Sequence, residues 1–281
     1  MSEGKRIGFV DYDLENFHAN VYLAAFRNEL RERGYDVAGC TALMENKGKA
    51  WAEKNGVTYY EDLDSLNREV DYYMVLAPSN PETHLQLCSQ VFPHGKATYV
   101  DKTFAPDLDT ARTIFALADQ YRTPVQTTSA LRYTNVQQYV QSMQPEKALH
   151  MVSWGGGRSF AEYAIHPLEM AVSCMGADVT SLLRRGEDPH TQLLLNFTGG
   201  RTAVVNVYTG SDTPFAAAVT SRLSTRLIAV DSAHLFIDVA AAVLDFFGSG
   251  LPAVNRQESL VIRQVLDAAQ LPASREGFIA L

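Results

Sequence analysis

A carboxylate and an imidazole, Glu162 and His166, follow three consecutive glycines, Gly155 to Gly157, at a spacing that could support proton transfer. Residues four apart on a helical turn share a face, so the carboxylate can orient the imidazole and raise its pKa. Proline is favoured at the first position of a helix, so a helix is expected to start at Pro167, with His166 immediately before it. The pattern indicates a proton-exchanging histidine, with a capping or packing histidine as the alternative.

A second candidate site follows the first apolar run, residues 7–10. A dinucleotide pyrophosphate usually lies at such a strand-to-helix turn, on a G-x-G-x-x-G motif. Here Asp11, Asp13 and Asn16 stand at the corresponding spacing. Because carboxylates add bulk and repel phosphate, the turn is expected to bind a dinucleotide weakly, to hold it in a shifted pose, or not to hold it. Asp13 or Asn16 is also expected to cap the following helix.

The end of the second apolar run, residues 37–40, lacks the acidic residue that would bind a ribose 2′-hydroxyl. Thr41 stands there, with Lys47 and Lys49 just beyond. A threonine with nearby lysines suits a 2′-phosphate better than a bare ribose. The alternative is that both lysines are simply solvated.

The elements that carry these residues alternate between strand and helix up to residue 128. The apolar patterns predict strands at 7–10, 37–40, 57–60, 71–76, 97–100 and 125–127, and helices at 21–30, 48–55, 84–92 and 108–121. Such alternation with short loops predicts a parallel sheet covered on both faces. Residues 1–128 are therefore expected to form a Rossmann-like, doubly wound α/β domain.

The alternation of strand and helix ends at residue 128. For residues 129–281 the sequence predicts an α+β domain with an open, mostly antiparallel sheet. Strands are expected at 148–154, 180–185, 191–197 and 202–209, with two more in 215–231, and helices at about 134–143, 235–247 and 256–269. Residues 202–209 carry apolar side chains on both faces, as a covered sheet requires. We therefore expect a homodimer or homotetramer formed through this sheet.

Composition excludes several classes of protein. The 281 residues include 24 Lys+Arg and 32 Asp+Glu, a net charge of −8, and are 46% hydrophobic and 20% charged. This is typical of a soluble globular protein, and the acidic balance argues against binding to nucleic acid or to an anionic membrane. The three cysteines lack C-x-x-C spacing, the histidines lack metal-ligand spacing, and no signal-like apolar segment is visible. We expect a cytoplasmic protein with reduced cysteines and no metal site.

Two further segments carry a family resemblance. A strand is followed by A-P-S-N-P-E-T-H at 77–84, then by H-G-K-A-T-Y-V-D-K-T at 94–103. With the glycine run and the Glu162 to His166 spacing, this order resembles the Gfo/Idh/MocA family of sugar and polyol oxidoreductases. The resemblance covers nearly the whole chain, and threonine replaces the proline of the family's E-K-P tripeptide. It implies that Lys102 is catalytic and that the cofactor contacts include Pro78, Asn80 and His84.

The resemblance further implies hydride transfer between NADP or NAD and a sugar, inositol or related polyol bound between the domains. His166 would take or give the hydroxyl proton, Lys102 would polarise the same oxygen, and Glu162 would orient or assist. Candidate substrate contacts, with packing as the alternative role, are Arg132, Tyr133 and Tyr163. Two other functions stay open: a non-catalytic relative that senses a sugar or dinucleotide, and a non-redox enzyme for elimination or epimerisation.

Overall fold

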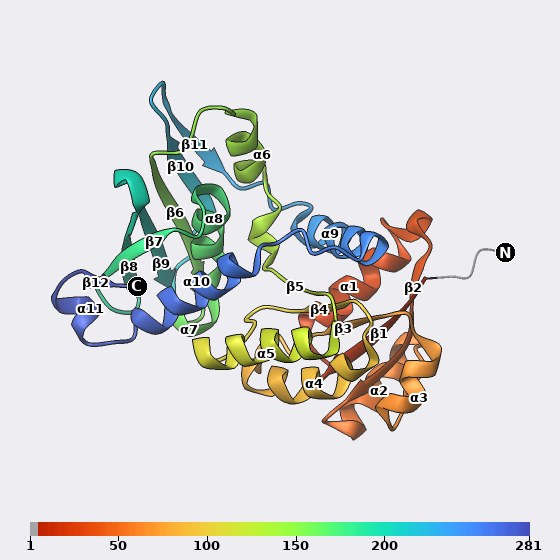
Figure 1. The fold of residues 1–281 in the computed structure, drawn as a ribbon. Helices are drawn as coiled ribbons and strands as arrows, with labels where there is room; N and C mark the ends of the chain where they lie inside the picture. The colour runs from red at the N-terminus through yellow and green to blue at the C-terminus, as the bar shows by residue number, and fades with distance from the viewer. Residues whose placement is uncertain (1–4) are drawn as a thin grey trace. The chain divides into compact units, whose positions relative to one another are not determined.

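A computed structural model describes residues 5–281 and divides the chain into two compact units (Figure 1). The first unit runs to Thr128 and also includes Phe236–Asn255, while the second comprises Ser129–Leu235 and Arg256–Leu281. The structure thus differs from the predicted domains 1–128 and 129–281 in one segment, because residues 236–255 return to the first unit.

The first unit is built on a five-stranded parallel sheet in the order β2-β1-β3-β4-β5. Its strands are β1 (Lys5–Asp11), β2 (Tyr35–Ala42), β3 (Tyr72–Val75), β4 (Thr98–Val100) and β5 (Val125–Thr127). The helices between them are α1 (Phe17–Arg27), α2 (Glu45–Asn55), α3 (Leu63–Glu69), α4 (His84–Val91) and α5 (Leu108–Tyr121). This arrangement confirms the predicted Rossmann-like α/β fold.

The strand predicted at residues 57–60 is wrong. Tyr59 forms only an isolated bridge with Cys40, and the Asp62 side chain already caps α3 by accepting from the Ser65 N–H. The early start of this helix leaves too little extended chain for a further strand. Short 3-10 helices lie at Arg31–Arg33, Pro81–Thr83, Phe92–His94, Ala130–Arg132 and Thr198–Gly200.

Helix α9 (Leu235–Ser249) shows why residues 236–255 join the first unit. The Phe247 ring stacks on Tyr72 of β3 with ring centroids 4.7 Å apart. The Tyr35 hydroxyl of β2 donates to the Leu244 carbonyl at 3.2 Å. The apolar face of α9 therefore packs beside strands about 200 residues away in sequence, a partner that helical periodicity alone does not specify.

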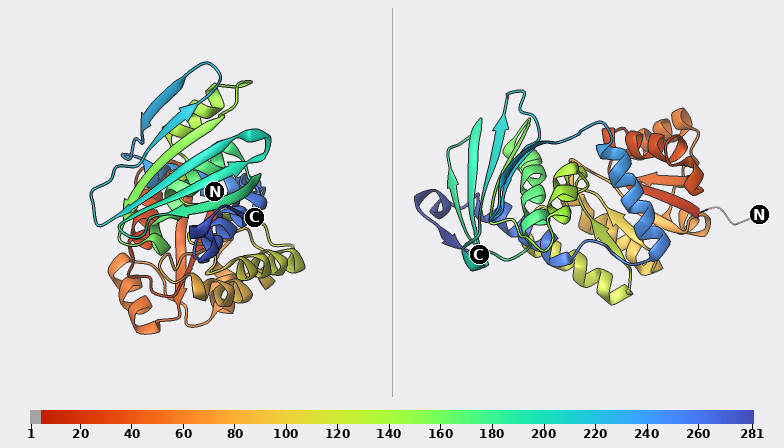
Figure 2. Two further views of the ribbon diagram at one scale, coloured as in Figure 1. Left: turned by 90° about the vertical axis from the view of Figure 1, so that its left-hand side faces the viewer. Right: turned by 90° about the horizontal axis from the view of Figure 1, so that it is seen from above.

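The second unit contains a seven-stranded sheet in the order β11-β10-β6-β9-β8-β7-β12, in which only the β6–β9 pair is parallel (Figure 2). Its strands are β6 (His150–Gly157), β7 (Val179–Arg185), β8 (His190–Phe197), β9 (Thr202–Thr209), β10 (Ala216–Thr220), β11 (Thr225–Ala229) and β12 (Ile279–Ala280). Its helices are α6 (Asn135–Ser142), α7 (Phe160–Tyr163), α8 (Ile165–Met175), α10 (Arg256–Ala268) and α11 (Ala273–Glu276). The predicted mostly antiparallel sheet is confirmed.

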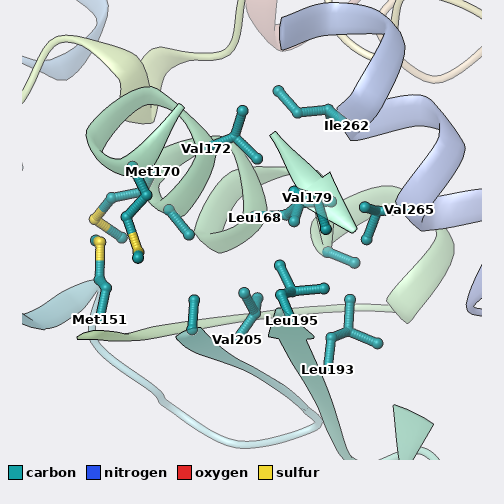
Figure 3. Close-up of a cluster of buried hydrophobic side chains, with 14 of the residues drawn as sticks. Met151, Leu168, Met170, Val172, Val179, Leu193, Leu195, Val205, Ile262 and Val265 are labelled. Atoms are coloured by element: carbon teal, nitrogen blue, oxygen red, sulfur yellow. The ribbon is translucent and has the colours of Figure 1, made fainter. Parts of the chain in front are cut away.

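The core of the second unit lies between this sheet and helices α8 and α10 (Figure 3). Leu168 and Val172 of α8 are fully buried and face Leu193, Leu195 and other strand residues with no exposed surface or nearly none. Truncating a side chain so buried typically costs about 2–5 kcal/mol. The buried side chains of α8 therefore fix the first turn of this helix, which carries His166, against the sheet.

The other face of the sheet carries a row of apolar side chains in cross-strand register. Leu194 pairs with Val204, Val204 with Val152, Val152 with Ala218, and Ala218 with Leu227. Leu227 is 78% exposed, and Leu194, Val204 and Val152 are half-buried. We call these five residues the outer row.

Candidate functional site

The turn after β1 is closed by hydrogen bonds to a buried carboxylate. The Asp11 side chain is 0% exposed and accepts from the Asp13 N–H at 3.2 Å, the Ala77 N–H at 2.9 Å and Asn16 Nδ2 at 2.9 Å. Burial raises the pKa of Asp11 to about 7, although these hydrogen bonds act in the opposite direction. The carboxyl of Asp11 is thus turned into the protein.

The bond from Ala77 to Asp11 also holds a strained residue at the end of β3. Ala77 has a φ of 46°, in the left-handed region, where a residue with a Cβ costs roughly 1–2 kcal/mol. The preceding Leu76 N–H donates to the Val10 carbonyl at 2.9 Å. Two successive amides therefore tie the β3 turn to the end of β1.

Asn16 is the N-cap of α1, as expected for this turn. Its side chain accepts from the Ala19 N–H at 3.0 Å, while its Nδ2 also donates to the Asp13 carbonyl at 2.7 Å. Asp13 instead pairs through Oδ2 with Lys47 Nζ at 2.7 Å. The residues in the glycine positions of the motif are thus linked to one another and to α2.

A cavity of about 370 Å³ opens at the carboxyl ends of β1 and β2. Thr41 lines it, together with the carboxylate-bearing residues Glu45, Glu61 and Asp62. Lys49 Nζ donates to Glu45 at 2.6 Å and to Glu61 at 2.8 Å. Both lysines that suggested a 2′-phosphate site are therefore engaged with carboxylates.

Lys102 lies directly after β4, at the same edge of the sheet. Its Nζ donates to the Pro78 carbonyl at 3.2 Å, and its backbone N–H donates to Asp101 Oδ1 at 2.8 Å. The peptide bond between Lys102 and Thr103 is cis. The loops after β3 and β4 thus meet at this lysine.

His84 joins the same two loops from within the protein. The ring is fully buried, with Nε2 2.7 Å from the Leu76 carbonyl and Nδ1 3.0 Å from the Phe104 carbonyl. Burial lowers its pKa, which favours the neutral ring. Asn80, by contrast, is half-buried and donates through Nδ2 to Glu82 at 3.0 Å.

Sequence reasoning missed one group in this unit. His18, in the first turn of α1, lies with Nδ1 2.5 Å from Oδ2 of the buried Asp101. The two residues are 83 positions apart, so spacing could not pair them. The only sequence signal was a histidine at the start of the first helix combined with an acid beside the expected catalytic lysine.

In the second unit, the glycines of β6 leave room for the residues around His166. A Cβ on Gly157 would lie 2.0 Å from the Tyr163 ring, and one on Gly155 would lie 2.9 Å from Pro167. The half-buried His166 ring contacts the rings of Tyr163 and Phe215 edge-on, with centroids 5.8 and 6.0 Å away. The glycine run therefore lets α7 and the start of α8 approach the sheet closely.

Glu162 and His166 fall on two consecutive helices, the one-turn α7 and the longer α8, and not on one continuous helix. Glu162 is exposed, and its N–H donates to the Ser159 hydroxyl at 3.4 Å. The predicted helix start at Pro167 lies two residues late, because α8 begins at Ile165.

Arg132 is part of a buried ion-pair network. Its guanidinium lies 3.4 Å from Glu169 and also contacts Glu258, while the other Glu169 oxygen accepts from the Ser129 N–H at 2.6 Å. Burial opposes the charge on Arg132, yet the two carboxylates raise its pKa. Tyr133 follows it as a half-buried residue.

Two further observations concern residues 5–281. No group of three or more His, Cys, Asp or Glu residues there is arranged to hold a metal ion. No helix in this range is both long and apolar enough to cross a membrane.

Comparisons with solved structures show the same fold along nearly the entire chain. Apo scyllo-inositol dehydrogenase from Lactobacillus casei is 12% identical, with a TM-score of 0.82 and coverage of 99% of this chain and 98% of that one. Myo-inositol 2-dehydrogenase from Lactobacillus plantarum is 13% identical, with a TM-score of 0.82 and coverage of 99% and 100%. UDP-N-acetylglucosamine 3-dehydrogenase from Acidithiobacillus ferrooxidans is 13% identical, with a TM-score of 0.76 and coverage of 96% and 97%.

A search of curated protein sequences finds no match. Residues 7–129 match the family GFO_IDH_MocA, described as an oxidoreductase family with an NAD-binding Rossmann fold. The match spans the sheet that carries Asp11, Thr41 and Lys102. The resemblance seen in the sequence is thereby confirmed over residues 7–129: this part of the chain matches the NAD-binding Rossmann domain of the Gfo/Idh/MocA oxidoreductase family.

Proposed function

We propose that this protein moves a hydride between a nicotinamide dinucleotide and a carbinol carbon of a sugar, inositol or related polyol. The observation that carries the proposal is Lys102, held at the carboxyl edge of the NAD-binding sheet by Pro78 and Asp101. Ligands of doubly wound folds bind at this edge. The solved structures of similar fold include two inositol dehydrogenases and a sugar-nucleotide dehydrogenase.

The residues of the first unit fit a dinucleotide with an altered pyrophosphate turn. The cavity beside Thr41 has the size of a small-ligand site and would hold the adenosine half. The carboxyl of Asp11 is withdrawn from solvent, which reduces its repulsion of a pyrophosphate near α1. When bound, the nicotinamide would accept or donate the hydride.

Side chains of the protein would then bind the substrate oxygen and exchange its proton. The Lys102 ammonium would donate a hydrogen bond to it and stabilise the negative charge that develops as the hydroxyl loses its proton. His166 would take that proton in oxidation and return it in reduction, and Glu162 would assist by its charge. Tyr163, against the His166 ring, is a proposed substrate contact, as is Tyr133. Arg132 would act mainly by holding Glu169.

A sugar-sensing or dinucleotide-sensing role is the second candidate. It is favoured by the turn of Asp11, Asp13 and Asn16, which already satisfies its own hydrogen bonds. A sensor would bind ligand without turnover, so the activity measurements below separate the two functions.

The first prediction concerns the choice of dinucleotide. Because Lys49 is paired and carboxylates line the cavity, cofactor-free protein titrated by calorimetry should bind NADH at least about tenfold more tightly than NADPH. The double variant Glu45→Gln/Glu61→Gln releases Lys49 and should narrow this ratio.

Glu53→Gln changes an exposed residue of the same helix that does not line the cavity and is the control. Tighter binding of NADPH by the wild type would refute the proposed preference.

The second prediction concerns the pH dependence of dinucleotide binding. Asp11 has a pKa of about 7, so it is mostly ionised at pH 8 and mostly neutral at pH 6. NADH should therefore bind more tightly at pH 6 than at pH 8, and Asp11→Asn should flatten this dependence. Glu15→Gln, which removes an exposed carboxylate from the same turn, should leave it unchanged.

Folding stability provides an independent check on the same group. A carboxyl whose folded-state pKa is raised from 3.8 to about 7 stabilises the fold most below pH 4, and that contribution is lost as pH rises towards 7. Relative to Asp11→Asn, wild-type unfolding free energy should fall across this window by roughly 1.4 kcal/mol per pH unit. A flat difference would mean that Asp11 titrates normally.

The third prediction concerns catalysis, with NAD⁺ and a panel of myo-inositol, scyllo-inositol and UDP-N-acetylglucosamine. Lys102→Met should lower kcat by roughly 10²- to 10⁴-fold with little change in Tm, because one positioned donor is lost. Lys54→Met, at an exposed position of α2, is the matched control. Full activity in Lys102→Met would show that Lys102 has a structural and not a catalytic role.

His166 should appear in the pH profile of the same reaction. Oxidation requires an unprotonated base, so kcat/KM should fall at acidic pH, and His166→Asn should abolish that limb with most of the activity. An active His166→Asn variant with the wild-type limb would show that another group carries the proton.

The fourth prediction concerns the proposed homodimer or homotetramer, which would bury the outer row. Leu194→Glu combined with Leu227→Glu should lower the mass measured by light scattering, because carboxylates would be buried in an apolar interface. Leu223→Glu is the control, since Leu223 is 81% exposed in the turn beside β11 and outside the row. A wild-type mass equal to one chain would exclude the oligomer.

A further inference from the structure

The His18 ring is fixed on several sides within the first unit. Phe17 and Phe236 lie edge-on to it, with ring centroids 6.1 and 5.2 Å away, and Tyr22 lies 6.1 Å away in the same manner. His18 is nevertheless slightly exposed, at 12% of its side chain. No residue in the described range 5–281 hydrogen-bonds Nε2, so Asp101 is its polar anchor.

Asp101 connects this ring to Lys102. Its carboxylate is 1% exposed, and its two oxygens have different partners: Oδ2 faces His18 Nδ1 at 2.5 Å, whereas Oδ1 accepts from the Lys102 N–H at 2.8 Å. The Tyr99 hydroxyl is 3.5 Å from Oδ1. The two oxygens of one buried carboxylate therefore contact the His18 ring and the backbone amide of Lys102.

We propose that His18 is a positioning residue for Lys102 and acts through Asp101. Its Nδ1–H donates to the buried carboxylate and orients it, and the carboxylate in turn fixes the backbone amide of Lys102, whose Nζ donates to the Pro78 carbonyl. A buried carboxylate that loses a donor is left with an uncompensated cost of desolvation, so it is expected to rotate away from its remaining partner. This inference rests on the proposed role of Lys102 in catalysis.

The experiment compares two substitutions that differ in one hydrogen bond. His18→Leu removes the donor to Asp101. His18→Asn retains one, because the asparagine amide nitrogen occupies nearly the same position relative to the backbone as Nδ1 of histidine. Tm values for both proteins report whether the fold survives.

The first measurement needs neither substrate nor dinucleotide. Cofactor-free protein is labelled with trace acetic anhydride at pH 8, and the rate at Lys102 is measured by peptide mass spectrometry relative to the exposed Lys54. Only the neutral amine reacts. In His18→Leu the Lys102 backbone loses its oriented partner, which should free Nζ from the Pro78 carbonyl and raise the Lys102 rate by about threefold or more. In His18→Asn the rate should stay at the wild-type value.

The second measurement uses the substrate of the panel that the wild type oxidises. His18→Leu should lower kcat by roughly 10- to 100-fold with KM nearly unchanged, and His18→Asn should restore most of it. Wild-type labelling of Lys102 in a folded His18→Leu protein would overturn the positioning role. Altered labelling, with Lys102→Met still fully active, would retain that role and refute the proposed catalysis instead.

Discussion

Polar groups buried at the carboxyl edge of the first sheet must find hydrogen-bond partners within the protein, and the loops of the site depend on this requirement. An unsatisfied buried donor or acceptor costs about 1–3 kcal/mol, comparable to a sizeable part of a domain's stability. Asp11 meets the requirement by binding the Ala77 amide, His84 by facing two carbonyls, and Asp101 by joining His18 to Lys102. These bonds tie the ends of β1, β3 and β4 together.

The same bonds give the dinucleotide region its electrostatic character. In a turn of glycines, backbone amides are available to phosphate. Here side chains take several of them: Asp11 accepts from the Asp13 N–H, Asp13 from the Glu15 N–H, and Asn16 from the Ala19 N–H. Lys47 and Lys49 are likewise paired with carboxylates. The fold of an NAD-binding domain is thus retained, while much of its usual hydrogen-bonding and charge capacity for phosphate is satisfied internally.

The second unit positions its candidate residues by packing. The buried side chains of α8 fix the helix that begins beside His166, and the ion pair of Arg132 with Glu169 links the start of this unit to the same helix. Glycines in β6 permit the close approach of Tyr163 and Pro167. A bulkier residue at Gly157 would have to displace the Tyr163 ring.

The sequence by itself determined the elements and several local features. Apolar periodicity located most strands and helices of both units, although it predicted a strand at 57–60 and missed α3. The sequence also predicted a cap from Asp13 or Asn16, which the structure assigns to Asn16, and motif order predicted a catalytic role for Lys102. Tertiary structure alone decided that α9 packs on the first sheet, that Lys47 pairs with Asp13, and that His18 meets Asp101. Periodicity and capping are local properties, set by residues within a turn or two. The partners of a side chain depend on which surfaces the fold brings together, and no spacing in the chain records that.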